Sequence, residues 1–155
     1  GIHEAVNGWM GEGIKDSALI LVITAAGGSF GEILGKSPIT GFIQTNMAGM
    51  NLGIFLPFLI AAALKTAQGS STVAIVTTAG ILAPMLATLG LDPALTALAI
   101  GAGAMVVSHA NDSYFWVVSQ FSNMPVSTAY KVYTSATAVE GVVAVAAIWL
   151  MSFIF

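Results

Sequence analysis

The sequence predicts an all-α integral membrane protein whose transmembrane helices include a re-entrant hairpin and a discontinuous helix. Of its 155 residues, 57% are hydrophobic and 7% are charged, whereas soluble domains carry about 25% charged residues. The four lysines and seven acidic residues, with no arginine, are too few to cover a water-facing surface. That shortage argues against the alternative, a soluble helical bundle rich in alanine and glycine. Two polar interruptions of otherwise apolar segments predict the hairpin and the helix break.

The same composition excludes several other classes of protein. The net charge of −3 comes without a basic patch, so we expect no nucleic-acid partner. Cysteine is absent, and the two histidines, His3 and His109, show no metal-ligand spacing. No signal peptide is visible, and the chain opens on glycine, so we expect a fragment or a processed chain. Residues 1–155 are expected to form a single membrane-embedded region, the C-terminal part of a longer protein.

Charged residues divide the chain into neutral segments. These are residues 17–31, 37–64, 66–91, 93–108, 113–130 and 141–155. A helix that spans the bilayer needs about 20 largely apolar residues, so some segments are long enough but interrupted, and others are too short. The last segment reaches full length if its helix starts near Ser135, with Glu140 in the first turns.

The first interruption lies within the third neutral segment. It consists of Gln68, Gly69, Ser70, Ser71 and Thr72. Glycine frees the backbone, and three consecutive hydroxyl side chains compete locally for backbone hydrogen bonds. The apolar segments on either side, residues 54–67 and 73–89, are therefore expected to be the two arms of a helical hairpin that enters the membrane and turns back.

The tip of that hairpin has the chemistry of an anion site. The first amides of a helix that begins after the tip have no intrahelical partners and carry partial positive charge. The three hydroxyls stand beside them, so we expect all five tip residues to contact a carboxylate substrate. The alternative is an ordinary helix cap, because serine and threonine are common cap residues.

The second interruption, residues 108–113, falls in the middle of what otherwise reads as one spanning helix. Asp112 is its most informative member, because an acid at the centre of a membrane helix costs about 2.5–3.5 kcal/mol on insertion scales. We expect Asp112, with His109, to carry a coupling proton. His109, Asn111 and Ser113 are further candidates for substrate contacts. The alternative is a polar loop at the membrane surface.

An enzymatic role is not expected. Ser108, His109 and Asp112 are the residue types of a hydrolytic triad, but neighbouring residues on one short segment point in different directions. No cofactor is expected other than the proton as coupling ion.

Three motifs carry a resemblance to a known family. They are ITAAGGSFGEILGKSPIT (residues 23–40), TAQGSSTVA (66–74) and VSHANDSYFWVVSQ (107–120). Together they resemble the gluconate permease family of proton symporters, and the likeness runs over essentially the whole chain. Members are similar to the wider ion transporter superfamily, which has inverted repeats, re-entrant hairpins and broken helices. The resemblance therefore implies that this chain is one half of an inverted-repeat transporter.

The function expected from this resemblance is proton-coupled symport across the bacterial inner membrane by a multi-pass protein. Gluconate, another aldonate, glycerate and D-serine all fit as small polar or anionic substrates. Expected partners are the lipid bilayer, a missing N-terminal half and a second copy in a homodimer. The alternative is a non-transporting membrane subunit or helix-assembly module, which the regular spacing of Gly27, Gly31 and Gly35 favours.

Overall fold

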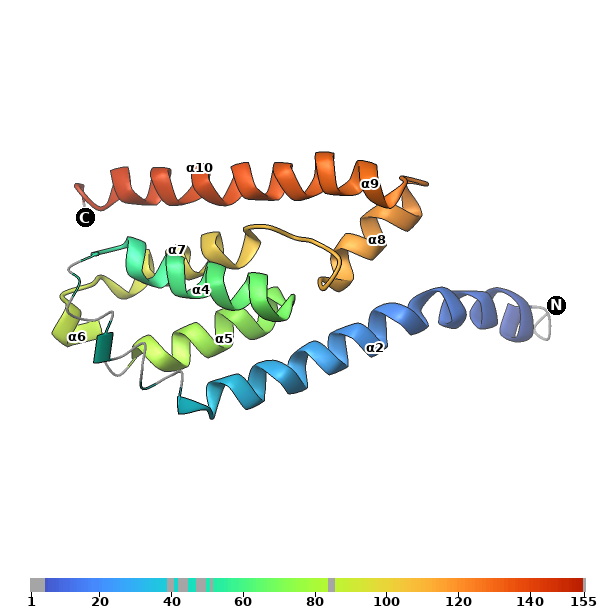
Figure 1. The fold of residues 1–155 in the computed structure, drawn as a ribbon, viewed down its shortest axis with the longest axis horizontal. Coiled ribbons are helices and arrows are strands. Elements are labelled where there is room, and N and C mark those ends of the chain that lie inside the picture. The colour runs from blue at the N-terminus through green and yellow to red at the C-terminus, as the bar shows by residue number, and fades with distance from the viewer. Residues whose placement is uncertain are drawn as a thin grey trace.

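The computed structural model describes residues 5–38, 41, 45–46, 50, 52–83 and 86–154, which form helices and no strand. With η for π-helical turns, the elements are η1 (Ala5–Trp9), α2 (Met10–Gly35), α4 (Phe55–Gln68), α5 (Ser71–Leu82), α6 (Leu86–Leu89), α7 (Pro93–Met105), α8 (Ser113–Phe121), α9 (Val126–Ala129), η4 (Tyr130–Thr134) and α10 (Ser135–Met151). Figure 1 shows α2 along one edge and α10 along the opposite edge, with α4, α5 and α7 between them. The expected all-α class is confirmed.

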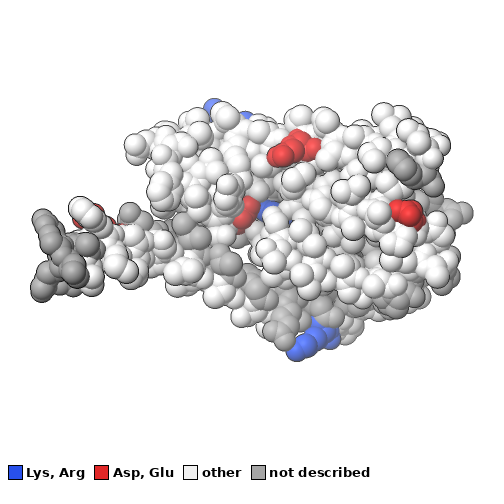
Figure 2. All heavy atoms as spheres, turned by 180° about the vertical axis from the view of Figure 1, so that it is seen from behind, with Lys and Arg blue, Asp and Glu red and all other residues white. Residues whose placement is uncertain are grey.

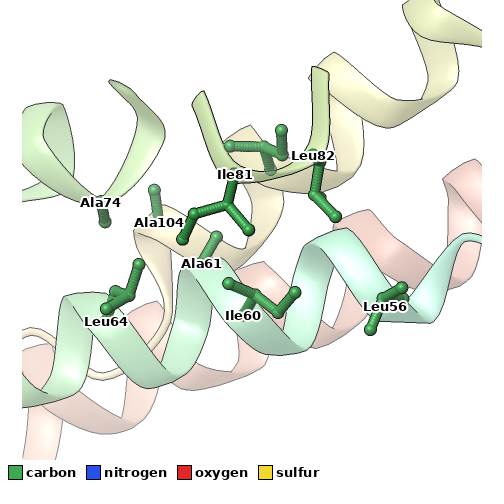
Figure 3. Close-up of a cluster of buried hydrophobic side chains, with 9 residues drawn as sticks. Leu56, Ile60, Ala61, Leu64, Ala74, Ile81, Leu82 and Ala104 are labelled. Atoms are coloured by element: carbon green, nitrogen blue, oxygen red, sulfur yellow. The ribbon is translucent and has the colours of Figure 1, made fainter. Parts of the chain in front are cut away.

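Helices α4 and α5 form a helical hairpin at the first predicted interruption. α4 ends at Gln68, Gly69 adopts a left-handed conformation with φ 85°, and Ser70 caps α5. Apolar side chains from both arms and from α7 fill the space between them (Figure 3). These are Leu56, Ile60, Ala61, Leu64, Ala74, Ile81, Leu82, Ile100 and Ala104. The small alanine side chains in this cluster let the helices approach closely. Membrane helices rely on such close packing, because the hydrophobic effect does not drive their association within lipid.

Glycines set the distance between α7 and its two neighbours. A Cβ atom added to Gly103 would lie 2.3 Å from the Phe58 carbonyl oxygen of α4. One added to Gly141 of α10 would lie 3.0 Å from the Ala102 carbonyl oxygen of α7. A second apolar cluster, from α4, α7 and α10, surrounds these contacts and includes Phe58, Ala99 and Val145. The backbone of α7 is therefore held close to both neighbours.

The second predicted interruption is a break between α7 and α8. The helix ends at Met105, residues 106–112 are not helical, and α8 begins at Ser113 with Asp112 as its N-cap. Phe115 is fully buried in α8 and packs against Tyr130 and Tyr133 of η4 at ring-centroid distances of 5.0 and 6.3 Å. These ring contacts hold α8 against the helix that follows it.

The C-terminal helix starts earlier than the sequence predicts. α9, η4 and α10 run on as one helix from Val126 to Met151, so the expected start near Ser135 is nine residues too late. Lys131 and neighbouring hydroxyl residues make residues 126–135 appear polar, but the chain is helical directly after Pro125. Among the described helices this is the one long and apolar enough to cross a bilayer. Glu140 consequently lies in the middle of the span instead of its first turns.

The surface carries few charges. Figure 2 shows one face on which acidic and basic side chains are few and scattered among uncharged atoms. Exposed apolar side chains on α10 include Val139, Val142 and Leu150, at 57–62% exposure. Such a surface suits contact with lipid.

Candidate functional site

The tip of the α4–α5 hairpin lies directly against the break between α7 and α8. A Cβ atom added to Gly69 would lie 2.1 Å from the Asn111 carbonyl oxygen. Glycine is therefore required at this position twice, once for its positive φ and once for the contact. The structure brings the two interruptions that the sequence singles out into contact.

Two side chains of the break reach back to the last turn of α4. The Asn111 amide nitrogen donates to the Thr66 carbonyl oxygen at 2.8 Å, and His109 Nε2 lies 3.2 Å from the same oxygen. Because a carbonyl oxygen only accepts, Nε2 carries the hydrogen in this contact. Asn111 Oδ1 is buried and has no hydrogen-bond partner among the described residues. Carbonyl groups in the last turn of a helix lack intrahelical hydrogen-bond partners. The contacts from Asn111 and His109 give the Thr66 carbonyl oxygen such a partner.

The centre of the site is a buried ion pair. The Lys65 ammonium of α4 lies 2.7 Å from Asp112 Oδ2, and the exposed fractions of the two side chains are 0% and 6%. Lys65 also donates to the Ser108 hydroxyl at 3.2 Å. Removal of one member of a buried pair leaves the other charge uncompensated and costs about 3–5 kcal/mol. Each charge therefore depends on the other to remain in this apolar interior.

Lys65 is a charged residue of this site that the sequence interpretation missed. It served there only as a boundary between two neutral segments, although it is the single charge between Lys36 and Asp92. A lone cation within about 20 apolar residues is expensive in a membrane, and that cost is the signal that identifies such a residue.

The other oxygen of Asp112 holds the start of α8. Asp112 Oδ1 accepts from the Tyr114 backbone N–H at 3.0 Å, which makes Asp112 the N-cap. The partial positive charge at a helix N-terminus adds to the attraction of Lys65 for the carboxylate. Both carboxylate oxygens are thus occupied, one by a side chain and one by the backbone.

The C-terminal helix fixes the position of Ser108 within the break. Ser108 N–H donates to Thr137 Oγ1 at 3.1 Å, and Thr134 Oγ1 donates to the Ser108 carbonyl oxygen at 2.6 Å. The preceding residue, Val107, has φ 53°, a left-handed conformation that is rare for a β-branched residue and costs about 1–3 kcal/mol. The surrounding contacts hold the backbone in this strained form beside the ion pair.

A cavity of about 200 Å³ opens beside the pair. Its lining residues come from α5, α7, the break, α8, η4 and α10, and they are Ser71, Met105, Ser108, Asp112, Tyr114, Tyr133, Thr137 and Glu140. Five of these eight residues carry a hydroxyl group and two carry a carboxyl group, although much of the lining surface is apolar. Ligand cavities typically measure about 300–1,000 Å³, so this one is small for a metabolite by itself.

The predicted site residues divide into three groups by position. Ser71 and Asp112 line the cavity. Gln68, Gly69 and Ser70 build the turn, because the Gln68 amide pairs with both backbone groups of Ser70, and Ser70 Oγ accepts from Val73 N–H at 3.3 Å. The remaining residues lie outside the cavity lining. Thr72 is exposed, and Ser113 is the first residue of α8. His109 and Asn111 contact the last turn of α4.

The helix-cap alternative therefore describes Ser70, whereas Ser71 is the hydroxyl of the tip that faces the cavity. Tyr133, Thr137 and Glu140 join the site only through the fold, because no local motif links them to the break.

Comparison with known proteins places the chain among transport proteins. The GntP family permease pattern matches residues 2–154. The high-affinity gluconate transporter of Escherichia coli (strain K12) is 35% identical over 129 residues, which cover 83% of this chain and 30% of that protein.

Two further relatives come from the same organism. The Gnt-II system L-idonate transporter is 37% identical over 126 residues (81% of this chain, 29% of that protein). The D-serine transporter DsdX is 38% identical over 144 residues (92% and 32%). The chain spans about a third of the length of these curated relatives. No solved structure matches the chain.

Proposed function

The chain belongs to the GntP permease family, a family of transporters and not of enzymes, and from this we propose that it is part of a secondary active transporter. The proposed transporter carries gluconate or a related small sugar acid into the cell together with protons. It is a multi-pass protein of the bacterial inner membrane. One observation carries the proposal: the hairpin tip meets the helix break around a buried ion pair, beside a cavity lined with hydroxyls.

The chemistry of the cavity supports a hydroxylated carboxylate as substrate. Gluconate, L-idonate and D-serine, the compounds in the names of the relatives, each combine a carboxylate with at least one hydroxyl group. Ser71 and Ser108 offer hydroxyls to a polyol, which needs groups that donate and accept. The Thr137 hydroxyl already accepts from Ser108 N–H and donates to the Thr134 carbonyl oxygen, so it shapes the lining. The five tip residues, with His109, Asn111 and Ser113, remain the proposed substrate contacts, and Ser71 has the most direct position.

Asp112, assisted by His109, is the proposed carrier of the coupling proton. Asp112 is 5% exposed and lines the cavity, so a proton that reaches the cavity also reaches its carboxylate. Ionisable side chains inside a membrane usually mark ion or proton pathways. The proton is the only coupling ion in this proposal, and no other cofactor takes part.

The architecture that fits this function is one half of an inverted-repeat transporter. In it, α4 and α5 are a re-entrant hairpin, and α7 and α8 are the two parts of a discontinuous helix. Transporters place such elements at the bilayer midplane, where a partner repeat completes the site. The small cavity agrees with a site that other parts of the full-length protein complete. A homodimer remains a prediction.

Uptake into proteoliposomes tests the proposal. The full-length protein that contains this chain is reconstituted, and accumulation of radiolabelled gluconate is measured with and without an inward proton gradient. Accumulation that depends on the gradient would support proton-coupled transport. No accumulation of gluconate, L-idonate or D-serine under either condition would contradict it and favour a non-transporting membrane subunit.

A further inference from the structure

We infer that Lys65 supplies the fixed positive charge that couples proton binding at Asp112 to binding of a substrate carboxylate in the adjacent cavity. The inference rests on the proposed function and adds a residue and a physical cause to it. When Asp112 takes up a proton, the charge of Lys65 loses its partner, and an anion in the cavity replaces it.

The geometry supplies the first step. Lys65 is 0% exposed and does not line the cavity, whereas both groups that its ammonium contacts, Asp112 at 2.7 Å and Ser108 at 3.2 Å, do line it. A carboxylate in the cavity therefore meets Asp112 and Ser108 directly and lies one layer of side chains away from the ammonium. Lys65 acts on the substrate through its charge and not as a direct ligand.

Charge balance supplies the second step. With Asp112 ionised, the pair is neutral, and the carboxylate repels a second anion from the cavity. With Asp112 protonated, the buried site carries one uncompensated positive charge, which low-dielectric surroundings make costly. A substrate carboxylate restores neutrality, and the protonated Asp112 and the Ser108 hydroxyl can each donate a hydrogen bond to it. Proton and substrate thus favour each other's binding, and this linkage is reciprocal.

The other titratable groups around the pair do not replace this positive charge. Among the described side chains they are His109 in the break, Tyr114 on α8, Tyr133 on η4 and Glu140 on α10. α5 and α7 contribute none. His109 is turned toward Thr66, and Glu140 adds a second negative group to the cavity. Lys65 is therefore the permanent cation available to an anionic substrate in this part of the molecule.

The test is equilibrium binding of radiolabelled gluconate to the purified full-length transporter over a series of pH values. In the wild type we expect the dissociation constant to fall by about tenfold per pH unit as the pH decreases, which corresponds to one proton per substrate. In Lys65→Gln we expect weaker binding by about 10- to 100-fold. Its pH dependence should weaken, because protonation of Asp112 then no longer leaves an unpaired positive charge for the substrate carboxylate.

Three further variants separate coupling from a merely structural role. Asp112→Asn imitates the protonated acid, so it should bind gluconate at every pH about as tightly as the wild type does at low pH. Lys65→Arg keeps the charge and should keep the pH dependence. The double variant Lys65→Gln/Asp112→Asn leaves no buried unpaired charge, so it should fold well and still bind weakly without pH dependence.

Lys131→Gln, which removes an exposed lysine from η4, is the matched control. Wild-type affinity in the folded double variant would overturn the inference, because the anion would then need no Lys65. Loss of the pH dependence in Glu140→Gln would also overturn it, since Glu140 would be the proton site.

If the wild type neither binds nor accumulates gluconate, L-idonate or D-serine, the proposed function fails first. If it accumulates gluconate but Lys65→Gln keeps wild-type affinity and pH dependence, only the inference fails.

Discussion

Lys65 and Asp112, 47 residues apart in the sequence, form an ion pair with an N–O distance of 2.7 Å and are both buried. One charge comes from the last turns of the first hairpin arm, and the other comes from the N-cap of the helix after the break. The pair therefore joins the two segments that depart from regular helix, and movement of either segment disturbs the charge balance of both.

Asp112→Asn in the full-length protein should abolish accumulation of gluconate driven by a proton gradient. The amide cannot carry a proton across the membrane, although it can still cap α8 through its side-chain oxygen. The measurement is uptake into proteoliposomes, with the amount of membrane-inserted protein determined in parallel. Normal gradient-driven accumulation by the inserted variant would refute the role of Asp112 in proton coupling.

Gly69→Ala should reduce uptake strongly. The left-handed backbone conformation costs an alanine about 1–2 kcal/mol, and its Cβ would lie 2.1 Å from the Asn111 carbonyl oxygen, so the tip must move away from the break. Initial uptake rates normalised to inserted protein provide the measurement. Gly80→Ala on α5 is the matched control, since nothing lies within 4 Å of its added Cβ atom. Equal rates for the two variants would show that contact between the tip and the break is not needed for transport.

Gly103→Ala should lower the thermal stability of the detergent-solubilised protein. Its Cβ would lie 2.3 Å from the Phe58 carbonyl oxygen and 2.9 Å from Ala61 Cβ, so α7 and α4 must separate. Overpacking of this kind typically costs about 1–3 kcal/mol. Gly101→Ala, two residues away with open space around its added Cβ, should preserve or raise stability through better helix propensity. The prediction is wrong if both substitutions shift the melting temperature equally.

Thr137→Val should also destabilise the protein, by about 1–3 kcal/mol, because it leaves the Ser108 N–H buried without its acceptor. Valine has nearly the same shape, so lost packing contributes little. Thr128→Val, on the exposed surface of α9, is the control and should leave stability nearly unchanged. Thermal unfolding monitored by size-exclusion chromatography measures both variants. A Thr137→Val protein as stable as the control would mean that another group, such as water, accepts from Ser108.

The sequence by itself determined the helical membrane class, the position of the hairpin turn and the position of the helix break. These features are local: a shortage of charge, Gly69 among hydroxyl residues, and the polar run from Ser108 to Ser113 each act on the backbone nearby. The three quoted motifs also carried the family resemblance, which the match over residues 2–154 confirms.

Only the tertiary structure decided which charges meet and which side chains share the cavity. Helical periodicity predicts neighbours three and four residues apart, so it cannot place Lys65 beside Asp112 or Glu140 beside Ser71. The start of the last helix escaped prediction for a related reason, because Tyr130 and Tyr133 of its first turns pack against Phe115 of α8, which is distant in the sequence. Contacts between distant segments depend on how the helices pack, and packing is a property of the whole fold.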